Sequence, residues 1–197
     1  MEASPAATPP PAPRGWRARQ HRLSTRIYGP SRRTAGLSWI PEERIAVGNL
    51  PTAASVVRLP GEGVTHVVNC RATPQTWISQ DLAVERALFG PSRVAHAPMW
   101  DNGRPQDPAK WATAAHFAAR ALDEDPDARV LIHCQQGRRR SVLVAYAILR
   151  LRGHSPEDAA RLILSNRTEG RLVPAYRASV EEWMAAGAPE PEPRRVR

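Results

Sequence analysis

The sequence predicts a single α/β domain in which a mainly parallel central sheet is flanked by helices. Short β-branched and apolar runs alternate with longer segments of helical character, which is the order of elements in α/β layer folds. The length of 197 residues suits one domain, and a hydrophobic fraction of 42% suits one buried core. The run Val130–Ile132 is entirely apolar, as is typical of the central strand of a buried parallel sheet.

Four strands are predicted from their composition. They are rich in β-branched and apolar residues and are bounded by glycine, proline or charged residues. The predicted ranges are Arg44–Leu50, Val64–Cys70, Arg93–Pro98 and Ala128–Cys134.

Helices are predicted in the intervals between these strands and after the last one. A short helix within residues 52–63 is closed by glycine, and another spans Gln75–Phe89. Asp107 is the expected N-cap of the next helix, with Pro108 at its first position. Three further helices are predicted at Ser141–Arg152, at a segment opened by Ser155–Asp158, and at Pro174–Ala186.

Both ends of the chain differ in composition from the middle. Residues 1–38 are rich in Pro, Ala and Arg and have no apolar period, so we expect a disordered tail. An Arg-rich, acid-poor N-terminus also suits a mitochondrial transit segment, but its prolines oppose the amphipathic helix that such a segment needs. We expect the folded domain over residues 39–187 and a second disordered tail over 188–197.

Charge and cysteine content narrow the classes of function. The net charge of +9 suits a nucleic-acid partner, but only one of the 28 basic residues is lysine, which indicates a GC-rich coding sequence, so we discount that partner. Two distant cysteines make neither a disulfide framework nor a four-ligand zinc site. No apolar run approaches the roughly 18 residues of a membrane span. We expect a reduced, cytoplasmic protein without a metal or cofactor; its oligomeric state stays open.

The stretch HCQQGRRRS, from His133 to Ser141, is placed where α/β folds bind ligands. It follows the most hydrophobic strand and precedes a helix, at the carboxyl edge of the predicted sheet. The five residues Gln135–Arg139 are enough to wrap once around a tetrahedral oxyanion with their backbone amides, including those of Gln136 and Gly137. Gly137 lies in the middle of the loop, where a side chain would obstruct the wrap around the anion or where a positive φ is needed.

The charged residues of this loop predict nucleophilic chemistry. Arg140 has the planar fork that grips two oxygens of a phosphate. In that positive field the pKa of the Cys134 thiol is expected to fall, which leaves a thiolate at neutral pH. A thiolate that faces a bound phosphoryl group is a nucleophile aimed for in-line attack.

The motif H-C-x₅-R-S, with Gly137 in its middle, resembles the signature of the cysteine-dependent protein phosphatases. The segment RIAVGNLPTAASVVRLPGEGVTHVVNC resembles the opening of the dual-specificity branch, and the resemblance extends from Trp39 to Ala186. The chain departs from that pattern at Pro174-Ala175, where relatives often have Pro-Asn, and at Cys70 and Arg71. The resemblance implies a dual-specificity-phosphatase-like catalytic domain.

The resemblance also implies a general acid on a separate loop, since the leaving oxygen needs a proton. Asp101, in MWDNGRP, is favoured over Asp107, which is better explained as a helix cap. Ser141 is implied to hydrogen-bond the cysteine sulfur; it also suits a helix N-cap. His133 is implied to orient the loop and support the thiolate, and its alternative is a buried polar residue satisfied by backbone.

Three further residues each have two alternative interpretations. Arg138 and Arg139 either select acidic substrates or are simply solvated. Cys70 is either a small buried apolar residue or a partner that protects Cys134 from oxidation.

The function implied is metal-independent hydrolysis of phosphomonoesters on phosphoproteins through a phosphocysteine intermediate. Phosphotyrosine is the first expected substrate, with phosphoserine and phosphothreonine open. Alternatives are a phosphoinositide, a sugar phosphate or an RNA 5′-phosphate as substrate, and a module that binds phosphate without catalysis.

Overall fold

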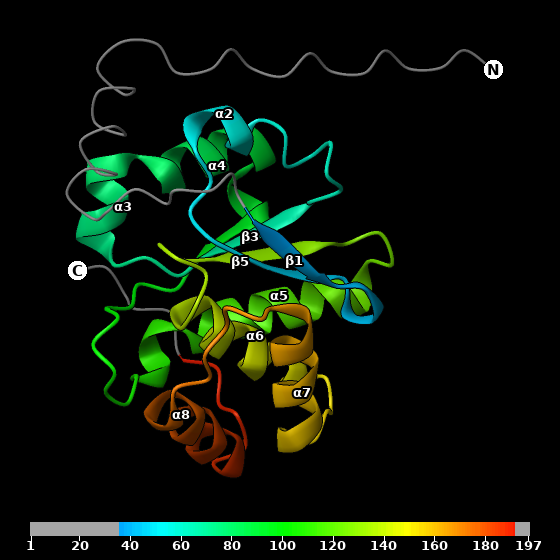
Figure 1. The fold of residues 1–197 in the computed structure, drawn as a ribbon, viewed down its shortest axis with the longest axis vertical. Coiled ribbons are helices and arrows are strands. Elements are labelled where there is room, and N and C mark those ends of the chain that lie inside the picture. The colour runs from blue at the N-terminus through cyan, green and yellow to red at the C-terminus, as the bar shows by residue number, and fades with distance from the viewer. Residues whose placement is uncertain (1–35, 192–197) are drawn as a thin grey trace.

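A five-stranded sheet with the order β1-β2-β5-β3-β4 forms the centre of the computed structural model, which describes residues 36–191 (Figure 1). β1 pairs antiparallel with β2, and the other pairs are parallel, as predicted. β5 lies between β2 and β3, so the predicted central strand is central. The strands are β1 (Leu37–Ile40), β2 (Ile45–Gly48), β3 (His66–Asn69), β4 (Val94–His96) and β5 (Val130–His133).

Helices cover both faces of the sheet (Figure 1). On one face lie α2 (Ala53–Val56), α3 (Thr73–Ser79) and α4 (Asp81–Phe89). On the other lie α5 (Ala112–Glu124), α6 (Arg140–Leu151), α7 (Pro156–Asn166) and α8 (Pro174–Ala185). α6 packs in the middle of the second layer, and its residues 140–149 are all buried. The single α/β domain is confirmed.

Strand alternation on β5 decides which side chains face which layer. Leu131 belongs to the smaller apolar cluster beneath α2 and α4, whereas Val130 and Ile132 belong to the larger cluster beneath α5 and α6. By the same alternation His133 faces the α4 layer, and Cys134 belongs to the α6 cluster. Two neighbours in sequence therefore have their side chains in different layers.

Four predicted helices have different bounds in the structure. The helix expected within residues 52–63 is only α2, which ends at Val56 with Val57 as its C-cap, so glycine does not close it. The segment 75–89 is two helices, because Gln80 adopts a left-handed conformation with φ +58° between α3 and α4. The helix expected from Asp107 begins as a 3-10 turn at Pro108–Lys110, and α5 starts only after Trp111 leaves helical geometry at φ −134°. α6 begins at Arg140, one residue before the predicted start.

The folded part is longer than predicted at both ends. Leu37 and Ser38 lie within the predicted tail, but they belong to the edge strand β1. Their pairing with β2 supplies partners for the backbone N–H and C=O groups of this segment. At the other end, the carbonyl of Pro189 accepts from Trp183 Nε1 at 3.0 Å, and Glu190 pairs with Arg120 at 2.7 Å. The rest of both predicted tails lies outside the described residues. Within residues 36–191 no helix is long and apolar enough to cross a membrane.

Candidate active site

The cysteine loop leaves β5 and is closed onto itself before α6 begins. The backbone N–H of Gly137 donates to Cys134 Sγ at 3.2 Å, and that of Cys134 donates to Gly48 O at 3.4 Å. Gly137 has φ +66°, and a Cβ there would lie 2.5 Å from the carbonyl oxygen of Gly48. Both a left-handed conformation and a close backbone approach therefore require glycine at this position.

The environment of Cys134 favours the thiolate. Burial alone raises the pKa of the thiol, but the positive charge of Arg140, the hydroxyl of Ser141 and backbone amides outweigh it and lower the pKa to about 7. The sulfur is 3.5 Å from Ser141 Oγ. The cysteine also precedes the N-terminus of α6, whose unpaired N–H groups favour an anion.

Ser141 lies within the first turn of α6 and does not cap it. The N-cap is Arg139, and no side chain caps this helix end. The capping reading of Ser141 is therefore wrong. Its hydroxyl faces the cysteine sulfur, and the side chain is fully buried.

Arg140 is buried beside the thiol and held in one orientation. Its Nη1 donates to Gln75 Oε1 at 2.9 Å and to the carbonyl of Met99 at 3.0 Å. Nε is buried and has no acceptor within residues 36–191. Sequence reasoning missed Gln75, which lies on α3 and comes next to Arg140 only through the packing of the fold.

Arg167 braces the cysteine loop from behind and was also missed. Its Nε donates to the carbonyl of Gly137 at 2.7 Å, and its Nη1 donates to Gly36 O at 2.8 Å and Ser38 Oγ at 3.2 Å. One buried guanidinium thus ties the loop to the strand β1. No local pattern marks this arginine among the many in the sequence.

Asp101 lies on a loop that passes beside Arg140. Met99, whose carbonyl binds Arg140, is two residues before it. Asp101 Oδ1 accepts from the hydroxyl of Tyr176 at 3.0 Å and lies 3.7 Å from Arg139 Nη1. Asp107, the other candidate acid, accepts from the N–H of Ala109 at 3.0 Å and caps the 3-10 turn, as predicted.

Within residues 36–191, no hydrogen bond or ion pair joins the side chain of His133 to the loop or to the thiol. Its Nε2 lies 2.7 Å from Glu85 Oε1 on α4, and both side chains are buried. Although burial opposes the charge, Glu85 raises the pKa of this imidazole above its usual value. His133 is a buried polar residue, as the alternative interpretation expected, but strand alternation turns it toward α4, and its partner is a carboxylate rather than backbone.

Glu85 belongs to a buried polar network that extends to Arg71. Asn69 Nδ2 donates to Glu85 Oε2 at 3.0 Å and to Asp81 Oδ2 at 2.8 Å. Arg71 Nη1 pairs with Asp81 Oδ1 at 2.7 Å, and Arg71 is fully buried. The unusual residue after Cys70 is thus a structural cation in the layer beneath the site.

Cys70 directly follows β3, and its N–H donates to the carbonyl of His133 of β5 at 2.8 Å. Burial, and next the nearby charge of Cys134, raise the pKa of the Cys70 thiol well above its usual value. Cys70 is therefore a protonated thiol at neutral pH. Its protective role stays a hypothesis.

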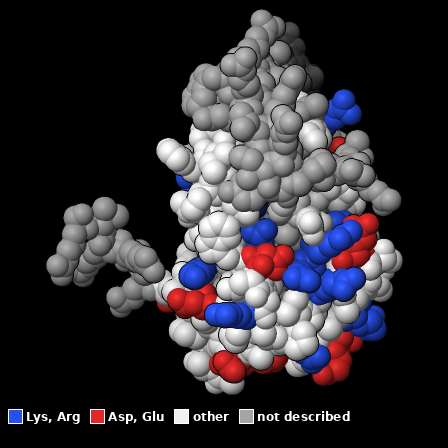
Figure 2. Space-filling view, turned by 60° about the vertical axis from the view of Figure 1, so that its left-hand side comes forward, with Lys and Arg blue, Asp and Glu red and all other residues white. Residues whose placement is uncertain are grey.

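The rim of the site carries arginines that are balanced by acids. Arg138 lies 3.7 Å from Glu169, as Arg139 does from Asp101, and both arginine side chains are about half-exposed. Gln136 is exposed at the rim, whereas Gln135 is buried. In Figure 2 several basic side chains gather on the visible part of the face shown, with acidic side chains beside them.

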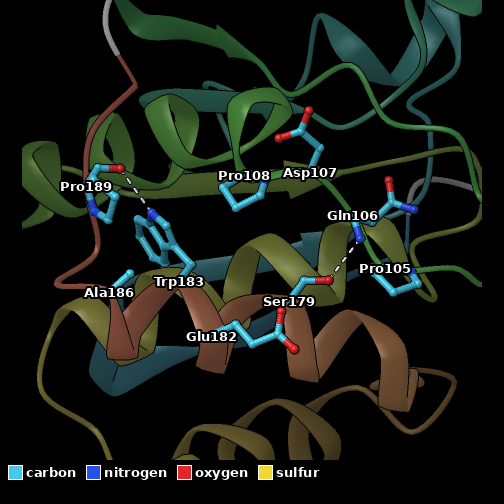
Figure 3. Close-up of a pocket in the computed structure, with 9 residues that line it drawn as sticks. All are labelled: Pro105, Gln106, Asp107, Pro108, Ser179, Glu182, Trp183, Ala186 and Pro189. Carbon is cyan, nitrogen blue, oxygen red and sulfur yellow. Dashed lines mark hydrogen bonds between the residues drawn. The ribbon is translucent and has the colours of Figure 1, made fainter.

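Two further features complete the surroundings. A cavity of about 550 Å³ lies between the far end of the Asp101 loop and α8 (Figure 3). No cluster of three or more His, Cys, Asp or Glu side chains in the described part of the chain is arranged to hold a metal ion.

Solved structures with this fold are cysteine phosphatases and their relatives. Human DUSP28 is 20% identical with a TM-score of 0.60, and the alignment covers 78% of this chain and 95% of that one. Kinase associated phosphatase, with its catalytic cysteine replaced by serine, is 16% identical with a TM-score of 0.65, covering 82% and 100%. PTPMT1 in complex with PI(5)P is 21% identical with a TM-score of 0.56, covering 74% and 94%.

No protein-family model matches this chain, and neither does any curated protein. At these identities the structural likeness concerns the fold. The chain has the fold of the dual-specificity phosphatases.

Proposed function

We propose that this chain is a cysteine-dependent phosphomonoesterase that acts on phosphoproteins. The observation that carries the proposal is the closed loop around Cys134, in which the N–H of Gly137 donates to the sulfur at 3.2 Å and Ser141 Oγ lies 3.5 Å from it. The charge of Arg140 and hydrogen bonds in this loop lower the pKa of the thiol to about 7. A buried cysteine with a merely structural role has a raised pKa, as Cys70 does. The proposal is supported by the shared fold with phosphatases.

In the first step the Cys134 thiolate attacks the phosphorus of the monoester. An S–P bond forms as the P–O ester bond breaks, and Asp101 gives its proton to the leaving oxygen. Arg140 and the loop amides bind the equatorial oxygens, on which charge is held in the transition state. The Nε–H of Arg140, which has no acceptor among residues 36–191, is a donor available for that task.

In the second step water cleaves the phosphocysteine. Asp101, now a carboxylate, takes a proton from the water as its oxygen attacks phosphorus, and the S–P bond breaks. The sulfur leaves as a thiolate, which Ser141 Oγ at 3.5 Å stabilises by hydrogen bonding. Inorganic phosphate is released, and Asp101 is protonated again for the next turnover.

A second candidate is hydrolysis of a non-protein phosphate. It is favoured by the half-exposed Arg138 and Arg139 at the rim, since a substrate with several phosphates would compete for them with Glu169 and Asp101. One structural neighbour is PTPMT1 in complex with PI(5)P. Relative rates on a phosphotyrosyl peptide and on vesicles that contain a phosphoinositide separate the two candidates.

Hydrolysis of p-nitrophenyl phosphate with EDTA present tests the chemistry. We expect the wild type to turn over, Cys134→Ser to lose about 10³-fold or more, and Asp101→Asn to slow about tenfold or more. Cys70→Ala is the matched control, since it removes the other buried thiol, and it should keep wild-type activity. An inert wild type that still binds tungstate would leave a phosphate-binding module and overturn the proposal.

A further inference from the structure

The loop that carries Asp101 is tied to α8 at two points. The hydroxyl of Tyr176 donates to Asp101 Oδ1 at 3.0 Å and accepts from the N–H of Gly103 at 3.2 Å. Three residues further along α8, Ser179 Oγ accepts from the N–H of Gln106 at 2.9 Å (Figure 3). Tyr176 is fully buried, so its hydroxyl is held in place by the core around its ring.

The loop and α8 also face each other across a cavity. Pro105–Pro108 at the end of the loop and Glu182 and Trp183 of α8 line the cavity of Figure 3. The hydrogen bonds of Tyr176 and Ser179 join loop and helix, and only the first of them reaches the carboxyl group.

The two oxygens of Asp101 have different surroundings. Oδ1 accepts from Tyr176 and faces Arg139 Nη1 at 3.7 Å. No hydrogen bond or ion pair reaches Oδ2 from residues 36–191. An oxygen that already accepts from a donor binds a proton less readily than a free one, because the hydrogen bond stabilises its negative charge and occupies one of its two lone pairs.

We propose that Tyr176 is a positioning residue for the general acid: its hydroxyl fixes Oδ1 of Asp101 and leaves Oδ2 to carry the proton that the leaving oxygen receives. This inference rests on the proposed function. Burial raises the pKa of the Tyr176 phenol, so the hydroxyl keeps its proton and remains a donor at neutral pH.

The chain offers a matched control in Tyr146 of α6. That tyrosine is also fully buried, and its hydroxyl donates to a carboxylate, Glu181 Oε1, at 2.6 Å. Tyr146→Phe and Tyr176→Phe therefore remove the same kind of hydrogen bond, but only Tyr176 contacts the acid. Unfolding midpoints of both variants show whether each remains folded.

The experiment compares two substrates that differ in their need for an acid. The p-nitrophenolate that leaves p-nitrophenyl phosphate is a weaker base than the phenolate that leaves phenyl phosphate, so its departure depends less on a proton. We expect Tyr176→Phe to lower kcat for phenyl phosphate about tenfold and for p-nitrophenyl phosphate less than about threefold, with KM unchanged. Tyr146→Phe should change neither rate. In an Asp101→Asn background, Tyr176→Phe should have no further effect.

The outcomes separate this inference from the proposed function. If Asp101→Asn slows the enzyme and Tyr176→Phe does not, or slows both substrates equally, Tyr176 does not position the acid. A loss that persists in the Asp101→Asn background would likewise show a purely structural role. If the wild type hydrolyses neither substrate, the proposed function fails and this inference with it.

Discussion

Replacing Arg140 with methionine tests whether its charge is what ionises Cys134. Methionine keeps an unbranched side chain of similar length in the core and removes the charge. Burial, which raises the pKa of the thiol, then acts against fewer opposing groups, because Ser141 and the backbone amides remain but the largest lowering influence is gone. We expect the thiol pKa to rise to the ordinary range or above it.

The size of the effect follows from the pKa. At pH 7 a thiol with a pKa of about 7 is half ionised. A thiol with the ordinary value of ~8.5 is about 3% ionised at that pH, so the thiolate fraction should fall about 15-fold. For the wild type, reactivity should rise as the pH increases through about 7 and then level off. In Arg140→Met the rise in reactivity should come at a pH about one to two units higher, because the pKa of the thiol is higher by that amount.

The assay is the rate of alkylation by iodoacetamide between pH 5 and 10, since only the thiolate reacts. Cys134→Ser is the blank, and Cys70 should contribute little because its raised pKa keeps it protonated. Arg139→Met, an exposed neighbour on the same loop, is the matched control and should leave the midpoint unchanged. A wild-type midpoint near 9, or equal midpoints for the wild type and Arg140→Met, would refute the reasoning.

Three further predictions concern the residues that support the site. Gly137→Ala should abolish activity, and unfolding in urea should show a loss of about 2 kcal/mol or more, because a left-handed alanine also clashes with β2; near-wild-type kinetics would contradict this. Arg167→Met frees two loop carbonyls and should lower kcat/KM about tenfold to a hundredfold, and an unchanged kcat/KM would show that other contacts hold the loop. Arg71→Met leaves Asp81 buried without its cation and should cost about 3–5 kcal/mol of stability above pH 5, whereas Arg161→Met at an exposed pair should not shift the midpoint.

The stability contributed by Asp81 has a defined pH range. Burial opposes its charge, but Arg71, Ser79 and Asn69 together hold the pKa of this carboxyl below its usual value. A carboxyl whose pKa is depressed in the folded state stabilises the fold at pH values above its pKa in the unfolded state. This stabilisation is lost as the pH falls from there through the folded-state pKa. Arg71→Met should therefore lose its effect on stability toward acid pH, which the same urea series at pH 3 to 7 measures.

Local pattern was sufficient for the fold class and the cysteine loop. The alternation of strands and helices, the apolar run of β5 and the glycine at position 137 each depend on neighbours in the sequence, and each is present in the structure. The sequence pattern gave the wrong helix bounds at Gln80 and Trp111. At each position a single residue leaves helical geometry, although the apolar spacing continues across it.

The contacts that hold the reacting groups were decided by the tertiary structure. Gln75 reaches Arg140 from another helix, Arg167 braces the loop from the end of α7, and Tyr176 reaches Asp101 from α8, next to the Pro174-Ala175 that departs from the expected pattern. His133 was assigned to the loop because it precedes Cys134, yet its partner is Glu85. By itself the sequence determined the strand, loop and helix around Cys134, because these elements are contiguous. Which side chains orient them was decided only when distant segments packed together, since such contacts leave no period in the sequence.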